Sequence, residues 1–139
     1  MTDRTLLRKT VILKAPPATV WDWLTQPDKL AQWFHPPRTP LVEGARLEMF
    51  GAQSGDLLVW GEVLTARAPE FLEYSFTIKP MGEAVSHVRW TLQEVSGGTR
   101  LTLEHEGMPD GPATFGTLLA IDKGWDGHLG DMRAKINDS

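Results

Sequence analysis

The residues best suited to proton chemistry in this sequence are one histidine and two carboxylates. His105 lies near the end of the segment TRLTLEHEG, in phase with Leu101 and Leu103, so it should face inward. An imidazole titrates near neutral pH and can act as an acid, a base or a hydrogen-bond donor. We therefore predict His105 as the first catalytic candidate. The structural alternative is an inward histidine that is hydrogen-bonded to a loop carbonyl.

Glu62 is the first carboxylate that could act with His105. It shares one face of a predicted strand with Trp60 and Leu64. If that face is the core, Glu62 is a buried carboxylate, and such groups are suited to proton transfer. The opposite phase, with Val59 and Val63 inside, fits the apolar pattern nearly as well, so both phases stay open.

Asp122 is the second carboxylate, and its direction follows from helix geometry. With 100° per residue and Trp125 at 0°, the apolar stripe of the last helix is centred near about 20°. Asp122 lies at about 60°, close to the stripe, whereas Asp126 and His128 flank it at about 100° and 300°. We therefore predict that Asp122 is the cavity group of the three. The alternative for all three is a solvated or rim position.

The last helix also carries Gly124, Gly127 and Gly130, each of which weakens a helix by about 1 kcal/mol relative to alanine. They lie at about 260°, 200° and 140°, centred opposite the stripe. The spacing predicts that they leave the back of the helix bare and do not line a cavity. A bend, a soft segment that admits a ligand, a docking face and a merely tolerated weak helix all remain open.

Several kinds of site are not indicated. The chain has no cysteine, its four histidines are isolated, and it has neither a P-loop nor a G-x-G-x-x-G motif, so we predict no metal and no cofactor. A net charge of −4 without a basic cluster argues against nucleic-acid binding. Neither a signal peptide nor an apolar membrane span is present, and we expect a soluble, cytoplasmic protein.

Hydrophobic periodicity predicts one α+β domain over residues 1–139. Alternation predicts antiparallel strands, and i, i+3, i+4 spacing predicts helices. The expected elements are a strand at 5–14, short helices at 17–25 and 28–34, strands at 45–51, 56–68, 71–79, 85–95 and 99–107, and a helix from about 114 to the end. Because the last helix is the only long element that can cover the sheet, the sheet must curl around it.

Six tryptophans against one tyrosine indicate either a tryptophan-rich core or a cavity with aromatic walls. Ligand pockets are mostly apolar with a few orienting polar groups. For the cavity we predict these ligand-binding residues: Trp33, Trp60, Tyr74, Phe76, Trp90, His105, Ile121 and Trp125.

The order of these elements resembles the START/Bet v 1-like (SRPBCC) superfamily, in its branch related to the activator of Hsp90 ATPase. The matching segments are APPATVWDWLTQPDKLAQWF, WGEVL, TRLTLEHEG and GWDGHL, and they run over essentially the whole chain. Trp33-Phe34 stands where that branch often has a tryptophan pair. The resemblance implies a helix-grip fold: a curved six-stranded antiparallel sheet around a long C-terminal helix, with two short helices after the first strand and a cavity between sheet and helix.

Three functions remain in consideration. We favour a binding protein for a small hydrophobic or aromatic molecule, on the resemblance and the tryptophan count. The second is a cyclase, dehydratase or hydrolase that uses His105 with Glu62 or Asp122. The third is a protein-interaction role, as a homodimer or with a chaperone partner such as Hsp90, supported by the HPPRTP loop and the bare glycine face.

Overall fold

The computed structural model describes residues 6–109 and 111–138. The elements follow one another as β1 (Leu6–Leu13), α1 (Pro17–Thr25), α2 (Pro27–Trp33), β2 (Arg46–Phe50), β3 (Leu57–Arg67), β4 (Phe71–Phe76), η1 (Lys79–Met81), β5 (Ser86–Val95), β6 (Gly98–Glu106), η2 (Pro112–Thr114) and α3 (Phe115–Asn137). The predicted order of strands and helices is confirmed. Thr5 and Ser139, at the outer ends of the first predicted strand and the last predicted helix, lie outside the described residues.

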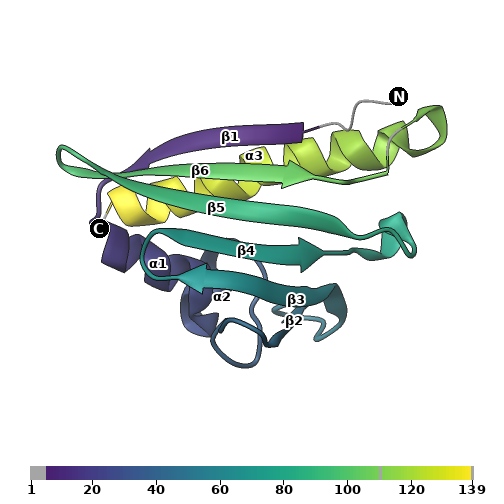
Figure 1. Ribbon diagram of the computed structural model, residues 1–139, viewed down its shortest axis with the longest axis horizontal. Coiled ribbons are helices and arrows are strands. Elements are labelled where there is room, and N and C mark those ends of the chain that lie inside the picture. Colours follow the sequence, from purple (N-terminus) through teal and green to yellow (C-terminus); the bar gives the residue numbers. More distant parts are fainter. Residues whose placement is uncertain (1–5, 110, 139) are drawn as a thin grey trace.

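The strands of the described residues form one antiparallel sheet of six in the order β1-β6-β5-β4-β3-β2. Figure 1 shows α1, α2 and α3 on the same side of this sheet, with α3 behind β1 and β6 in that view. A sheet that is covered on one face has a buried side and a solvent side, so its strands should alternate. The arrangement is the α+β helix-grip fold that the sequence predicts.

The core lies between the helices and the covered face of the sheet. In β4, Leu72, Tyr74 and Phe76 are buried, whereas the residues between them are only partly buried. The stripe predicted for α3 is also buried, from Ile121 and Trp125 onward. Burial of this stripe explains how α3 tolerates its glycines, since tertiary packing rather than helix propensity supplies most of the stability of such a helix.

The strand phase of β3 is the opposite of the one that would make Glu62 a buried group. Val59 and Val63 are buried, while Glu62 is exposed and Trp60 is partly exposed on the other face. Of the two phases that stayed open, the structure has the one in which Glu62 is not buried, and Trp60 does not face the core. Gly61 lies between the two valines, and a Cβ there would collide with the backbone carbonyl of Ser75 on β4. Only glycine allows this close approach of β3 to β4.

The first part of β3 and the end of β4 diverge from a regular ladder. The register of this pair shifts after Val63, and the amide of Glu62 donates to the hydroxyl of Ser75 over 2.9 Å rather than to a carbonyl. Bulges of this kind bend a strand. The strand predicted for residues 71–79 ends at Phe76, and Lys79 and Pro80 form the short helix η1 instead. These departures shape one wall of the cavity described next.

Candidate functional pocket

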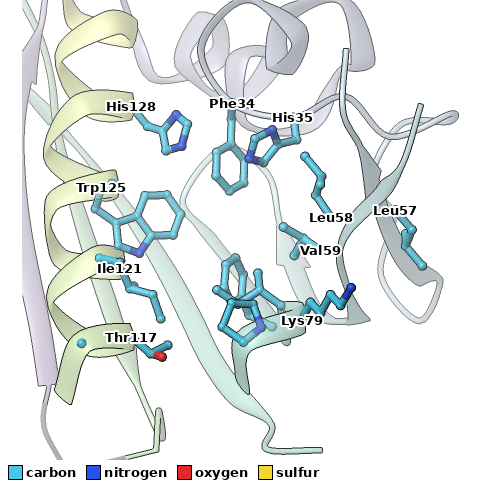
Figure 2. Close-up of a pocket in the computed structure, with 16 residues that line it drawn as sticks. Phe34, His35, Leu57, Leu58, Val59, Lys79, Thr117, Ile121, Trp125 and His128 are labelled. Carbon is cyan, nitrogen blue, oxygen red and sulfur yellow. The ribbon is translucent and has the colours of Figure 1, made fainter. Parts of the chain in front are cut away.

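A cavity of about 530 Å³ opens between the N-terminal half of α3 and the sheet, as Figure 2 shows. The other walls come from the segment after α2, the start of β3, the end of β4 and η1. Its lining is mostly apolar: Phe34, His35, Leu57, Leu58, Val59, Phe76, Ile78, Lys79, Pro80, Gly116, Thr117, Ala120, Ile121, Gly124, Trp125 and His128. A cavity of this size and character is typical of small-molecule sites.

The side of α3 that faces the cavity is made of small residues. Gly116, Ala120 and Gly124 are spaced four residues apart, so they lie one above another on the same flank of the helix. A Cβ at Gly116 or Gly124 would meet no atom within 4 Å. The prediction that the glycines stay out of the cavity is therefore wrong for Gly124. The missing side chains leave room beside the helix, and the series ends at His128.

Aromatic rings form the inner end of the pocket. Phe34 is the residue that follows α2, and its ring stacks on Trp125 of α3 with centroids 5.1 Å apart and an interplanar angle of 25°. The Phe34 ring also stacks on Trp33, with ring centroids 5.2 Å apart. Trp90 supports Trp125 from behind in an edge-on contact at 5.5 Å. Offset and edge-on aromatic contacts of this kind are favourable, so the wall is well fixed.

His105 is fully buried behind Trp125 and takes part in a directed chain of hydrogen bonds. The indole N–H of Trp125 donates to Nδ1 of His105 over 2.9 Å. Because Nδ1 accepts, a neutral ring carries its hydrogen on Nε2. Nε2 lies 2.8 Å from the hydroxyl oxygen of Ser86, and that hydroxyl donates to the carbonyl of Phe76 over 2.6 Å. Both nitrogens of His105 are therefore occupied.

This environment makes His105 a neutral structural residue. Burial, and to a smaller extent the charge of His87, lowers the pKa of His105 from 6.5 to about 3. His105 is not among the residues that line the pocket. An inward histidine satisfied by hydrogen bonds is thus the correct alternative, although its partners are Trp125 and Ser86 rather than a loop carbonyl. Its hydrogen bond holds the indole of Trp125, the principal aromatic wall of the pocket.

Three of the eight predicted ligand-binding residues line the pocket, namely Phe76, Ile121 and Trp125. The other five lie elsewhere: Trp33, Tyr74, Trp90 and His105 are buried in the core, and Trp60 is on the outer face of the sheet. Trp33 and Trp90 hold the wall from behind through Phe34 and Trp125. The prediction for these five is therefore wrong, because most of the tryptophans form a core.

Asp122 lies on the other flank of α3, away from the pocket. Its carboxylate is 2.7 Å from Nζ of Lys9 on β1, and Asp126 is 2.9 Å from the same nitrogen. Hydrogen bonds from Asp122, and then from Asp126, raise the pKa of Lys9. The prediction of Asp122 as a cavity group is wrong because the cavity lies on the flank of the stripe where His128 lies.

Thirteen of the sixteen lining residues were not among the predicted ligand-binding residues, and two of these thirteen are histidines, His35 and His128. Figure 2 shows His128 reaching from α3 toward Phe34 and His35, which come from the segment after α2. The series of small residues at 116, 120 and 124, four apart and followed by His128, is a signal that the sequence does contain. No comparable signal marks His35, because its place depends on how the loop after α2 folds back over the cavity.

The pocket is poor in charge. Its ionisable lining residues are His35, Lys79 and His128. Burial lowers the pKa of His35, and the charge of His128 lowers it further. Among residues 6–109 and 111–138, no group of three or more histidine, cysteine, aspartate or glutamate side chains is placed to hold a metal ion. None of the helices that the structure describes is long and apolar enough to cross a membrane.

Comparison with known proteins gives one family and many similar structures. A family model for activator of Hsp90 ATPase homolog 1-like protein matches residues 14–136. No curated protein matches the sequence. MLL2253 from Mesorhizobium loti is 23% identical with a TM-score of 0.81, covering 93% of this chain and 94% of that one. The Aha1 dimer from Colwellia psychrerythraea is 15% identical with a TM-score of 0.77, covering 96% of each chain. Both likenesses show the fold.

A third structure is DynU16, described as a protein in the dynemicin biosynthetic locus. It is 26% identical to this chain with a TM-score of 0.77. The match covers 92% of this chain and 45% of DynU16, so the chain spans less than half of the length of that relative.

Proposed function

Because the chain belongs to the activator of Hsp90 ATPase homolog 1-like family, we propose that it uses the fold of that family to bind a small hydrophobic or aromatic molecule beside α3. The observation that carries this proposal is the cavity of about 530 Å³ with its apolar walls. Ligand sites typically have volumes of about 300 to 1,000 Å³ and a small number of polar groups.

The shape of the pocket supports a flat ligand. Phe34 and Trp125 stack on each other, and Phe76 lies 6.1 Å from Trp125 by ring centroids, so aromatic surfaces meet at one end of the cavity. Aromatic pairs of this kind favour a further ring in an offset or edge-on position. Leu58, Ile78 and Ile121 complete the apolar lining.

The likeness to DynU16 supports the same conclusion, since a protein in a biosynthetic locus works where small organic molecules are made. The match covers 45% of that protein, so it supports a shared domain rather than a shared overall activity.

The three residues named in the enzyme hypothesis do not lie together in the pocket. His105 is enclosed and has both nitrogens occupied, Glu62 is exposed on the outer face, and Asp122 pairs with Lys9. The two features that favoured a protein-interaction role each contribute one residue to the pocket. His35, the first residue of the HPPRTP loop, and Gly124 both line the cavity.

The test is a thermal-shift screen of the purified protein against aromatic and hydrophobic molecules, followed by NMR of the ¹⁵N-labelled protein with each hit. A ligand at a hundred times its dissociation constant should stabilise the native state by about 2.7 kcal/mol. Hits should shift the amide signals of Gly116 and Gly124 and the indole N–H of Trp125. Hits that shift only residues on the outer face of the sheet, such as Trp60, would contradict the proposal.

A further inference from the structure

Two histidines converge at the aromatic end of the pocket. His128 comes from α3 and His35 from the segment after α2, and Figure 2 shows both beside the Phe34 ring. Their ring centroids are 5.4 Å apart in an edge-on arrangement. Each ring also contacts Phe34, at 4.7 Å for His35 and 4.9 Å for His128. The packing around Phe34 therefore holds two polar rings against an apolar cavity.

The hydrogen-bond direction of His128 is fixed by its neighbour. Its Nδ1 lies 2.9 Å from the backbone carbonyl of Trp33. A carbonyl oxygen can only accept, so Nδ1 carries the hydrogen. In the neutral imidazole the second nitrogen, Nε2, is then an acceptor with a free lone pair. No hydrogen bond joins Nε2 to another group in the part of the chain that the structure describes, and the ring lines the pocket.

His35 supplies the complementary group. Because burial lowers its pKa, His35 is neutral near physiological pH, and a neutral imidazole offers one N–H donor and one acceptor. Lys79, the remaining ionisable residue of the lining, lies on η1, below both histidines in Figure 2. The two histidines thus bring hydrogen-bonding ring nitrogens to the same end of the pocket.

We propose that this pocket selects aromatic molecules that carry a hydroxyl group, such as phenols and enols, whose O–H donates to Nε2 of His128. The inference rests on the proposed function and names the ligand class of the same site. A hydroxyl oxygen can accept from the N–H of His35 while its hydrogen is donated to His128, so one group satisfies both rings. A carboxylate or an ether oxygen only accepts, and it would face the lone pair of Nε2.

The test compares four probes of the same ring size by isothermal titration at about pH 8: 2-naphthol, 2-methoxynaphthalene, naphthalene and 2-naphthoate. One hydrogen bond has a net value that corresponds to about a fivefold to tenfold difference in affinity. We expect 2-naphthol to bind the wild-type protein tighter than each of the other three by at least that factor.

Two substitutions of His128 separate its two nitrogens. His128→Asn keeps an N–H near the position of Nδ1 and removes Nε2, so it should retain the bond to Trp33 and lose the preference for 2-naphthol. His128→Gln keeps a polar group near the position of Nε2 and should retain part of the preference. The preference is measured as the ratio of 2-naphthol affinity to naphthalene affinity within each variant. Because naphthalene makes no hydrogen bond, this ratio removes any effect of the lost ring packing of His128. Long-range ¹H–¹⁵N NMR of the wild type should show hydrogen on Nδ1 of His128.

The outcomes distinguish the inference from the function on which it rests. Equal binding of 2-naphthol and 2-methoxynaphthalene, tighter binding of 2-naphthoate, or an unchanged preference in His128→Asn would overturn the inference and leave the binding function intact. Failure of all four probes, together with no hit in the wider screen, would overturn both. The comparison of probes on the wild-type protein stands even if a variant folds poorly.

Discussion

The indole N–H of Trp125 donates to Nδ1 of His105 over 2.9 Å, so the principal wall of the pocket is held by a buried neutral histidine. The sequence predicts His105 as an acid or base, yet the chain of hydrogen bonds through Ser86 to the carbonyl of Phe76 occupies its other nitrogen. His105 therefore acts through Trp125 and contributes geometry rather than protons.

His105→Leu should destabilise the protein in a pH-dependent way. Near pH 7 the substitution leaves the buried indole N–H of Trp125 without a hydrogen-bond acceptor. This should lower the free energy of unfolding by about 1 to 3 kcal/mol. The pKa of His105 falls from 6.5 to about 3 on folding. The unfolded wild-type chain therefore binds an extra proton between these values, and wild-type stability should fall as pH drops through this window, by at most about 1.4 kcal/mol per pH unit.

Urea unfolding of both proteins between about pH 7 and pH 4 measures this effect. The leucine variant lacks the titrating group, so its deficit relative to wild type should shrink as the pH is lowered. A matched control is His87→Leu, which leaves His105 in place and should keep most of the pH dependence. A deficit that is constant over the whole range would contradict a neutral, buried His105.

Gly124→Leu should block the pocket without harming the fold. A Cβ at Gly124 meets no atom within 4 Å, and the position lines the cavity. Leucine is also a better helix former than glycine by about 1 kcal/mol. We expect at least a tenfold loss of affinity for any pocket ligand, measured by isothermal titration, with an equal or higher melting temperature.

The control for this change is Gly127→Leu, the same substitution at an exposed position of α3 that is not part of the lining. It should raise helix stability similarly and leave affinity unchanged. Equal affinity in both variants would show that ligands bind elsewhere.

The elements of this fold were predictable because their signal is local. Alternation in β4 and the i, i+4 stripe of α3 record which side of each element is buried, whatever its partner. The apolar pattern of α3 does not indicate on which flank of the helix the cavity lies. Asp122 and His128 lie on opposite flanks of the same stripe, and the choice between them depends on how α3 is placed against β1 and its ion pair with Lys9.

The phase of β3 shows the same limit. Its two faces are nearly equal in apolar residues, so the pattern around Glu62 is ambiguous. The phase is consistent with the close approach of the Ser75 carbonyl to Gly61. This contact joins two strands, so the sequence of β3 alone does not reveal it. His35 is a similar case, since a loop after α2 brings it to α3.

Gly61→Ala should be strongly destabilising for this reason. The new Cβ would collide with backbone atoms of Ser75, which cannot rotate away, so β3 and β4 must separate. Overpacking of this kind typically costs about 1 to 3 kcal/mol. Thermal unfolding measures the loss, and Gly130→Ala, where a Cβ meets open space, should be neutral or stabilising. A wild-type melting temperature for Gly61→Ala would disprove the close approach.

Asp122→Asn should have a small structural effect and no effect on binding. The side chain of Asp122 is 42% exposed, and its carboxylate pairs with Lys9 outside the pocket. Partly exposed ion pairs contribute about 0 to 1 kcal/mol, and salt screens them. We expect a loss of stability within that range at low salt, a smaller one at high salt, and unchanged ligand affinity by titration. A clear loss of ligand affinity would contradict this prediction and show that Asp122 takes part in binding.

The N-terminal half of α3 is held to the rest of the domain along one of its edges. Lys9 joins Asp122 to β1 on that edge, whereas between Gly116 and Gly124 the other edge faces the cavity. A bound molecule would supply the missing packing on the free edge and become a structural part of the domain. Resistance to unfolding and to proteolysis would then rise with ligand concentration. Under the proposed function, the abundance of this protein in a cell would follow the supply of its ligand.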